Sequence, residues 1–282
     1  MWPVVRAVLP DVTGRFADLV ASADPKALAT PDWTVADTAA HVVAIASIYT
    51  TLLAPDGAKV ANPALAERIP AVTVDTVADL NDLALRHFTE RDPAALAAML
   101  RSMIGSIVDM TEGTDPESTV PWLGDSRLPV AGVLAHFVNE LLIHGWDIAR
   151  AVGAPWTIPS HEAGLFFDLF IVGLVRNDFG SLLDGVPPSD RRIAVAFRSR
   201  HTRPVTLVLH RGRVSAEEPG GPVDVRVSFD PAVLHLVLFG RVGRVRAAVT
   251  GKLRVSGRRP WLLPAFLRAV RMPTNAVPLS AG

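Results

Sequence analysis

The stretch from His136 to Arg150, HFVNELLIHGWDIAR, constrains the fold of this 282-residue chain more than any other. Its apolar residues surround the helix that it predicts, which is typical of a helix buried in a bundle. Glu140 and His144 lie four residues apart, so they project from nearly the same face of that helix. Ionisable groups in a buried helix need a partner. By itself the spacing fits either an ordinary carboxylate and imidazole pair or two ligands of a metal ion.

Composition excludes several classes of protein. The 28 basic and 28 acidic side chains cancel, so nothing indicates nucleic acid or an anionic membrane as a partner. The absence of cysteine excludes disulfides, thiolate metal sites and a catalytic protein thiol, so any thiol chemistry must use a thiol from outside. The amino terminus lacks a signal-peptide pattern, and the most apolar window, 163–175, is short and contains Asp168. We therefore expect a cytoplasmic protein without a membrane span.

Helical periodicity divides the first half of the chain into four regions, 4–23, 34–54, 74–110 and 129–152. Pro10 is expected to kink the first helix or to delay its start. Thr34 and Asp37 form an N-terminal capping box for the second helix. Asp92, followed by proline, indicates a restart inside the third region, and Gly153 is a natural end for the fourth. Four helices of these lengths predict an antiparallel four-helix bundle for residues 1–155.

Facing helices of such a bundle supply inward ligands. His41, about two turns into the second helix, would join Glu140 and His144 to give two imidazoles and one carboxylate around one ion, with positions left for water or substrate. His136 is either a fourth ligand, a hydrogen-bond donor behind the ligands or a substrate contact. Asp147 either accepts from the second ring nitrogen of a ligand histidine or pairs with Arg150.

Two tryptophans flank these helices. Trp33, directly before the second helix, is interpreted as a hydrophobic anchor at the entry of that helix and not as a substrate contact. Trp122 lies in a long connection, 111–128. Loops of that length in a compact domain often border a site.

The second half predicts a smaller α+β domain, residues 156–282, built on an antiparallel sheet. A helix is expected over 160–178. A period of two then predicts strands around 193–197, 205–209, 223–229 and 246–257, with Arg211 and Gly212 as a hairpin turn. Asp230 caps a further helix, and the last helix follows Pro260.

Three stretches, DWTVADTAAHVV, NELLIHGWDIARAVG and LHLVLFGRVGRVRAAVTGKLRVSG, resemble the mycothiol-dependent maleylpyruvate isomerase family. The resemblance covers most of the chain. Its sharpest part pairs Trp-Thr-Val-x-Asp-x-x-x-His with Glu-x-x-x-His-x-x-Asp. It implies a DinB-like metal-binding helix bundle joined to a sterol-carrier-protein-like domain, with metal ligands at His41, Glu140 and His144.

The resemblance also implies a chemistry. A divalent ion, usually zinc, would hold mycothiol or another low-molecular-weight thiol as its thiolate, for S-transfer to a small electrophilic substrate or for its isomerisation. The family uses an arginine of the second domain for a substrate carboxylate. Candidates in the matching stretch are Arg241, Arg244, Arg246 and Arg254, and the role of His235 nearby is open.

Two other functions fit the same residues. The protein would be a non-catalytic, metal-stabilised binder of an apolar ligand or lipid, or a hydrolase that uses zinc-bound water. Two histidines and one carboxylate also suit iron, nickel or manganese. The substrate, the catalytic residues other than the ligands and the oligomeric state are not predicted.

Overall fold

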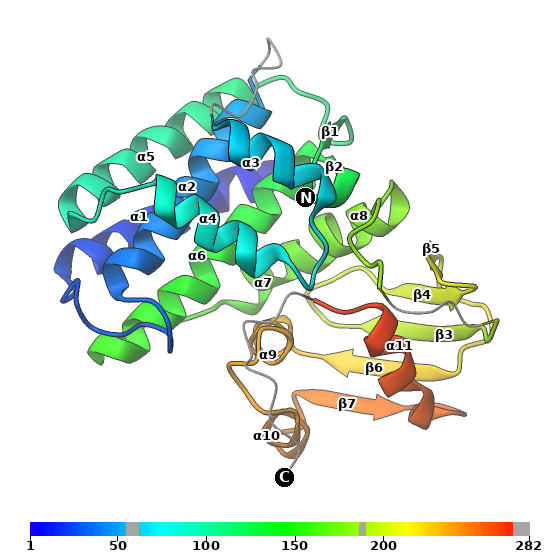
Figure 1. Ribbon diagram of the computed structural model, residues 1–282. Helices are drawn as coiled ribbons and strands as arrows, with labels where there is room; N and C mark the ends of the chain where they lie inside the picture. Colours follow the sequence, from blue (N-terminus) through cyan, green and yellow to red (C-terminus); the bar gives the residue numbers. More distant parts are fainter. Residues whose placement is uncertain (55–61, 186–189, 273–282) are drawn as a thin grey trace.

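The computed structural model describes residues 1–54, 62–185 and 190–272. A helical region comes first and a sheet region follows it, side by side in Figure 1. The helices of the first region are α1 (Trp2–Ser22), α2 (Val35–Leu52), α3 (Pro63–Arg68), α4 (Val77–His87), α5 (Pro93–Met110) and α6 (Val130–Val152). The expected combination of a helical amino-terminal region with a carboxy-terminal sheet domain is confirmed.

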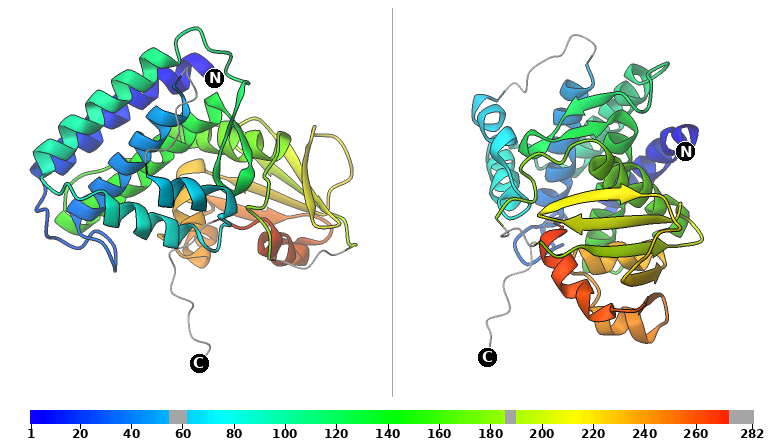
Figure 2. Two further views of the ribbon diagram at one scale, coloured as in Figure 1. Left: turned by 45° about the horizontal axis from the view of Figure 1, so that its top comes forward. Right: turned by 90° about the vertical axis from the view of Figure 1, so that its right-hand side faces the viewer.

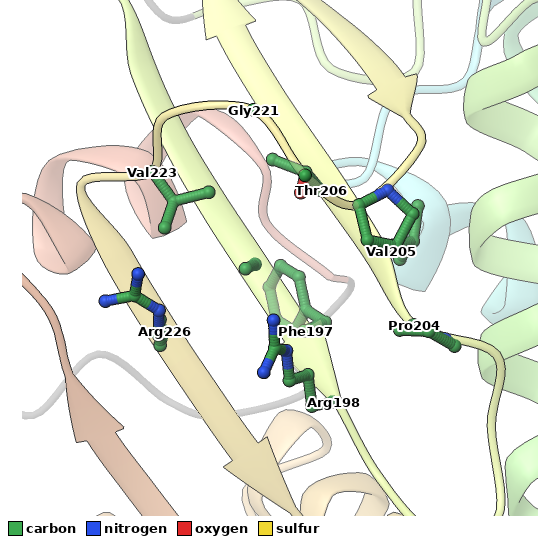
Figure 3. A pocket seen from close by; sticks show the side chains of 11 residues that line it. Phe197, Arg198, Pro204, Val205, Thr206, Gly221, Val223 and Arg226 are labelled. Atoms are coloured by element: carbon green, nitrogen blue, oxygen red, sulfur yellow. The ribbon is translucent and has the colours of Figure 1, made fainter.

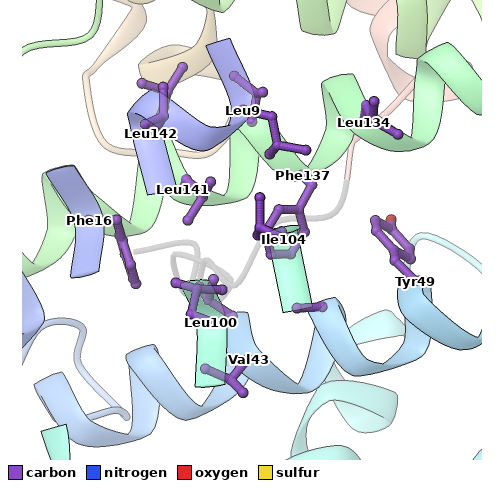
Figure 4. Packing of buried hydrophobic residues seen from close by; sticks show 14 of the residues in the cluster. Leu9, Phe16, Val43, Tyr49, Leu100, Ile104, Leu134, Phe137, Leu141 and Leu142 are labelled. Carbon is purple, nitrogen blue, oxygen red and sulfur yellow. The ribbon is translucent and has the colours of Figure 1, made fainter. Parts of the chain in front are cut away.

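The four longest helices close into a ring around the main core. α1 packs against α5 and α6, and α2 packs against the same two helices. α1 and α5 run along each other in the left view of Figure 2. Figure 4 shows the interior of the ring, where buried side chains from all four helices meet, among them Leu9, Phe16, Val43, Leu100, Ile104, Phe137 and Leu141.

Local signals set the ends of these helices as predicted. The Thr34 hydroxyl accepts from the Asp37 N–H, and the Asp37 carboxylate accepts from the Thr34 N–H, which completes the capping box. Asp92 accepts from the N–H of Ala95, and α6 ends at Gly153 in a left-handed conformation, φ 70°. Pro10 does not delay α1, which begins eight residues earlier at Trp2 and contains the proline.

The third predicted region, 74–110, is not one layer of a four-helix arrangement. α5 belongs to the ring, whereas α3, α4 and the short 3-10 helix η1 (Ile69–Ala71) form an outer layer against α2 and against the 3-10 turn η2 (Leu123–Asp125). This layer has its own small core of Leu65, Val72, Leu80 and Ala84. The helical region therefore holds more elements than the four expected helices.

A continuous helical run connects the two regions. It consists of α7 (Ser160–Leu165), the π-helical segment η3 (Phe166–Ile171) and α8 (Val172–Arg176). Phe166 and Phe170 belong to the core of the helical ring, whereas Phe167 and Val172 belong to the core beneath the sheet. A single helix thus contributes to both cores, and the division at residues 155 and 156 stays a prediction.

The sheet has the order β5-β4-β3-β6-β7. Its strands are β3 (Ile193–Arg198), β4 (Val205–His210), β5 (Arg213–Glu217), β6 (Val225–Phe229) and β7 (Leu253–Ser256), and β1 (Thr119–Pro121) and β2 (Arg127–Pro129) form a separate ribbon. The predicted antiparallel sheet is corrected to a mixed one, because β6 runs parallel to β3. Residues 218–224 carry the chain from β5 past β4 to the far side of β3, so β6 arrives in the direction of β3.

Another correction concerns the predicted strand 246–257. Its first part is a helix, α10 (Arg244–Val249), and only β7 pairs with the sheet. The remaining helices are α9 (Pro231–Leu238), capped by Asp230 as predicted, and α11 (Leu263–Ala269), which the 3-10 turn η4 (Pro260–Leu262) precedes. Phe266 of α11 is fully buried in the core beneath the sheet.

Two helices, α2 and α5, are long and apolar enough to pass a length and composition test for a membrane span. Of the tested residues, 61% in α2 and 28% in α5 are buried inside the protein. Both helices supply side chains to the main core, such as Val43 and Leu100. Packing in the helical ring therefore accounts for the apolar side chains that these two helices bury.

Candidate metal centre and the adjoining cavity

α2 and α6 bring the three predicted ligand residues together. His41 Nε2 lies 3.5 Å from Glu140 Oε2, and His144 Nε2 lies 3.4 Å from the same oxygen. The three potential ligand atoms all lie within 4.8 Å of one another. His41 and His144 are 3% and 7% exposed, so bulk water reaches little of either ring. Within the described ranges this is the one cluster of histidine and acidic groups with such a spacing.

The donor set suits a divalent cation. Burial would raise the pKa of Glu140, but contacts with His144 and His41 outweigh it and hold the pKa well below its usual value, so the carboxylate is ionised. Burial lowers the pKa of His41 and keeps its ring neutral, with a lone pair available. Two imidazoles and one carboxylate that converge without a hydrogen bond of normal length are the ligand pattern of open zinc sites.

His144 is tied to the sheet region through Asp147. Its Nδ1 lies 3.4 Å from Asp147 Oδ2, and Arg241 donates to both oxygens of that carboxylate at 3.1 and 2.7 Å. Burial alone would lower the pKa of His144, but Asp147 and Glu140 raise it to about 9. A proton on this ring at neutral pH is what a bound cation would displace. Of the two predicted roles for Asp147, the structure shows the contact with His144, whereas Arg150 lies over the ring of Trp146.

His136 stands behind the carboxylate, one turn before Glu140. The Trp122 indole N–H donates to the Tyr49 hydroxyl at 3.0 Å, so this hydroxyl directs its own proton to His136 Nδ1 at 2.9 Å. Burial lowers the pKa of His136 and keeps the ring neutral. Its proton is therefore on Nε2, which faces Glu140 Oε1 at 3.5 Å. Of the three predicted roles, this geometry favours a donor behind the ligands.

Trp33 lies closer to the site than the sequence indicated. Its ring centroid is 4.8 Å from that of His41 and 6.3 Å from that of His144, and it lines the cavity in front of them. Trp33 packs against the main core, which agrees with its interpretation as a hydrophobic anchor, and the expected lack of a substrate contact stays a prediction. Trp33 directly precedes Thr34, the N-cap of α2, so the start of this helix places the indole beside the two histidines.

A cavity of about 510 Å³ opens in front of the three residues. The trio, His136 and Trp33 all line it, and most of its remaining wall is apolar. The walls come from α2, from the α3–α4 layer, from the run α7–α8 and from residues near 239 and 270. The long connection 111–128 contributes Trp122, so this loop borders the cavity.

A smaller hollow of about 140 Å³ lies on the sheet, under the loop 218–224. Figure 3 shows Arg198 and Arg226 on neighbouring strands at its side. Among the residues that the structure describes, no histidine or acidic residue lines it, so these residues offer none of the ligand types that meet at the larger cavity.

The four candidate arginines of the carboxy-terminal region differ in their position relative to the large cavity. Arg241 lines the large cavity, whereas Arg244, Arg246 and Arg254 are exposed to solvent. His235 is fully buried with its ring centroid 4.9 Å from that of Phe166, and neither ring nitrogen has a hydrogen-bond partner among the described residues. Sequence reasoning missed Tyr49, although a signal existed. It is the sole tyrosine of the chain and lies eight residues after His41 on the same apolar helix.

The family model of the mycothiol maleylpyruvate isomerase N-terminal domain matches residues 9–149, which include all three ligand-type residues. The chain belongs to this family. That membership confirms the resemblance and bears out the interpretation of the chain as an enzyme of the thiol-dependent isomerase type. No curated protein sequence matches the chain.

Solved structures agree on the fold. A crystal structure of the mycothiol-dependent maleylpyruvate isomerase matches with a TM-score of 0.52 at 14% identity, over 91% of this chain and 93% of that one. A histidine-to-alanine mutant of that isomerase matches with the same score and coverage at 12% identity. Sterol carrier protein 2 from Yarrowia lipolytica matches 25% of this chain and 64% of its own, at 20% identity and a TM-score of 0.20. That score carries no conclusion, so the sterol-carrier-like assignment stays a prediction.

Proposed function

We propose that the protein is a divalent-metal-dependent enzyme that uses mycothiol, or a similar low-molecular-weight thiol, for isomerisation of an electrophilic substrate or S-transfer to it. One observation carries the proposal: His41, Glu140 and His144 converge in the wall of a large cavity in a chain without cysteine. Such a chain needs an external nucleophile for thiol chemistry. Membership of the isomerase family supports the same reaction class.

The residues of the candidate site have two proposed roles, as metal ligands and as groups that orient the ligands. His41, Glu140 and His144 would hold the ion, which we propose to be Zn²⁺ on the basis of its two nitrogen donors and one oxygen donor. Asp147 Oδ2 faces His144 Nδ1 at 3.4 Å and would keep the Nε2 of that ring directed at the centre, while Arg241 pairs with Asp147. His136 Nε2 faces Glu140 Oε1 and would orient that carboxylate in the same way. Such supporting residues orient metal ligands and adjust their basicity.

When bound, the ion and the external thiol would supply a stabilised thiolate that adds across an activated carbon–carbon double bond. In an S-transfer, the proton lost from sulfur would go to the neighbouring carbon. In an isomerisation, the adduct would rotate about the former double bond and release the same thiolate, so the double bond would re-form without net proton transfer. The chain contributes the enclosure. His41 and His144 are almost fully buried, which limits access of water to the reacting atoms.

The finer fold assignment belongs to the same proposal. We propose that the ring of α1, α2, α5 and α6 is the DinB-like bundle, and that residues 156–282 form the sterol-carrier-like domain. The closed packing of the ring and the presence of both regions support this. A reduced thiol as cosubstrate fits the cytoplasm, where thiols are kept reduced.

Metal analysis combined with a thiol-dependence assay tests the function. The wild type should bind a single divalent ion per chain, and turnover should require both the ion and added mycothiol. The variant His144→Ala should lose both properties, whereas His210→Ala, at an exposed end of β4, should keep them. Turnover without thiol would indicate the hydrolase, and ligand binding without any turnover would indicate the non-catalytic binder.

A further inference from the structure

We propose that the substrate is a neutral, apolar α,β-unsaturated carbonyl compound with an aryl or extended alkyl body, and that the cavity selects against dicarboxylates. This inference rests on the proposed function, because it names the substrate class of the same site. It follows from the size of the cavity, from the side chains of its walls and from the state of its arginines.

The cavity is larger and more apolar than a small dianion requires. Its volume of about 510 Å³ is within the range of roughly 300–1,000 Å³ that drug-sized ligands occupy. Apolar side chains from separate elements face it, including Ile48 of α2, Val77 of α4, Leu174 of α8 and Phe239. All four are only half-buried by the protein. An apolar ligand would cover the rest of their surface, which stabilises the complex by roughly 25 cal/mol per Å².

An aromatic wall lies beside the proposed centre. Phe166 and Phe170 stack with their ring centroids 4.8 Å apart, and the ring of Trp122 meets Phe170 edge-on at 5.0 Å. His136, which faces Glu140, is 4.8 Å from Phe170. All four residues line the cavity. A flat, conjugated ligand would find ring faces and edges to pack against, within reach of the ligand residues.

The two arginines of the cavity are already neutralised. Arg241 donates to both oxygens of Asp147 and to the carbonyl of Phe239. Arg271 donates to both oxygens of Asp75 and to the carbonyls of Leu183 and Asp184. Each guanidinium is therefore paired with a carboxylate of the protein itself.

No other arginine or lysine among the described residues lines the cavity. Asp125 at its edge adds a carboxylate that pairs with no cation in the described part of the chain. A divalent ion at the centre would be offset by Glu140 and by the thiolate. A dicarboxylate would thus lose its hydration without gaining a countercharge, which is costly, whereas a neutral enone loses little.

The test uses the zinc-loaded enzyme with mycothiol and three electrophiles: chalcone, methyl vinyl ketone and maleylpyruvate. Addition to chalcone forms a C–S bond at the β-carbon, uses the C=C bond and returns the thiol proton to the α-carbon. We expect kcat/KM for chalcone, after subtraction of the uncatalysed reaction, to exceed that for maleylpyruvate by roughly ten- to hundredfold, the equivalent of burying one aromatic ring. Methyl vinyl ketone, which has the same reactive group without the rings, should fall below chalcone.

Two variants locate the effect. Leu174→Lys adds a cation to the wall and should shift the ratio of kcat/KM toward maleylpyruvate, whereas Leu28→Lys, at a side chain 65% exposed, should not. Val77→Trp fills part of the cavity and should lower kcat/KM for chalcone by a larger factor than kcat/KM for methyl vinyl ketone. Zinc content and melting temperature identify a variant that fails to fold. If either Leu174→Lys or Val77→Trp fails to fold, the kinetics of the remaining variant test the proposal.

A binding arm separates the two proposals. Dihydrochalcone, which lacks the double bond, should quench tryptophan fluorescence of the zinc-loaded protein without thiol. If dihydrochalcone binds and no electrophile is turned over, the proposed function is wrong, but the proposal that the cavity holds an apolar ligand is supported. If maleylpyruvate is turned over more efficiently than chalcone and dihydrochalcone does not bind, the substrate class is overturned while the function stands.

Discussion

Arg241, in the segment after α9, donates two hydrogen bonds to Asp147 on α6, although 94 residues separate them in sequence. Asp147 is 2% exposed and also faces His144, so this ion pair connects the sheet region to the proposed metal centre. The contact makes the second half of the chain part of the site. Replacement of Arg241, the partner of Asp147, by an uncharged residue therefore tests the importance of this ion pair.

Removal of this partner should destabilise the protein. In Arg241→Met the carboxylate of Asp147 is left buried beside His144 with no guanidinium, and loss of one partner of a buried ion pair typically costs about 3–5 kcal/mol. The free energy of unfolding from urea titration measures it. Arg244→Met, at an exposed position on α10, is the control and should change the free energy by less than ~0.5 kcal/mol. Equal effects of the two variants would contradict a structural role of the pair.

The hydroxyl of Tyr49 should fix the tautomer of His136. At neutral pH the ¹⁵N spectrum of histidine-labelled protein should show His136 neutral with its proton on Nε2, because Tyr49 donates to Nδ1. In Tyr49→Phe this preference should disappear, and stability should fall by ~1–3 kcal/mol because the Trp122 N–H loses its acceptor. An unchanged spectrum in the variant would rule out this donor relationship.

His235 should make stability depend on pH. Burial lowers its pKa to about 3, against about 6.5 in an unfolded chain, so the folded protein holds the ring neutral while the unfolded chain takes up a proton below pH 6.5. This contribution to stability is present above pH 6.5 and is lost progressively as the pH falls toward 3, by at most ~1.4 kcal/mol per pH unit. The difference in unfolding free energy between His235→Leu and wild type should therefore grow in favour of the variant as the pH falls from 6.5. A difference independent of pH would contradict it.

Gly145, next to His144, should tolerate no side chain. A Cβ at this position would overlap the indole ring of Trp156, and that ring is held by its hydrogen bond to the Leu142 carbonyl at 3.0 Å. Gly145→Ala should therefore destabilise the protein by ~1–3 kcal/mol through overpacking. Gly105→Ala is the matched control, since no atom lies within 4 Å of its Cβ and alanine favours the helix by ~0.5–1 kcal/mol. Thermal unfolding should give shifts of opposite sign, and a stabilised Gly145→Ala would contradict the packing.

The predictable part of the site was local. The spacing of Glu140 and His144 follows from one helix, and His41 follows from a capped neighbouring helix that must face it in a compact arrangement. Their convergence needed no long-range information beyond that. The family resemblance named Arg241 as one of four candidates for a substrate carboxylate. The ion pair of Arg241 with Asp147 and the hydrogen bond of Tyr49 with His136 were not predicted, because sequence separations of 94 and 87 residues leave no periodic signal.

The errors in the fold have physical reasons as well. The direction of β6 depends on where the segment 218–224 crosses the sheet. The alternation of apolar and polar residues within β6 predicts a strand but not its direction. The sequence of α10 mixes valines with arginine and alanine, which are strong helix formers, so a period of two there was ambiguous. α3 and α4 bury a small separate core, and a helix count could not assign them to an outer layer.

Cobalt substitution tests the central claim most directly, because Co²⁺ bound to a thiolate has an intense charge-transfer absorption in the near ultraviolet. Mycothiol should be titrated into Co²⁺-loaded wild-type protein and into a His41→Ala variant treated in the same way. The account predicts a saturable thiolate-to-cobalt band in the wild type and no such band in His41→Ala. A wild-type protein that binds Co²⁺ but shows no band with mycothiol, or a variant that shows the same band, would contradict it.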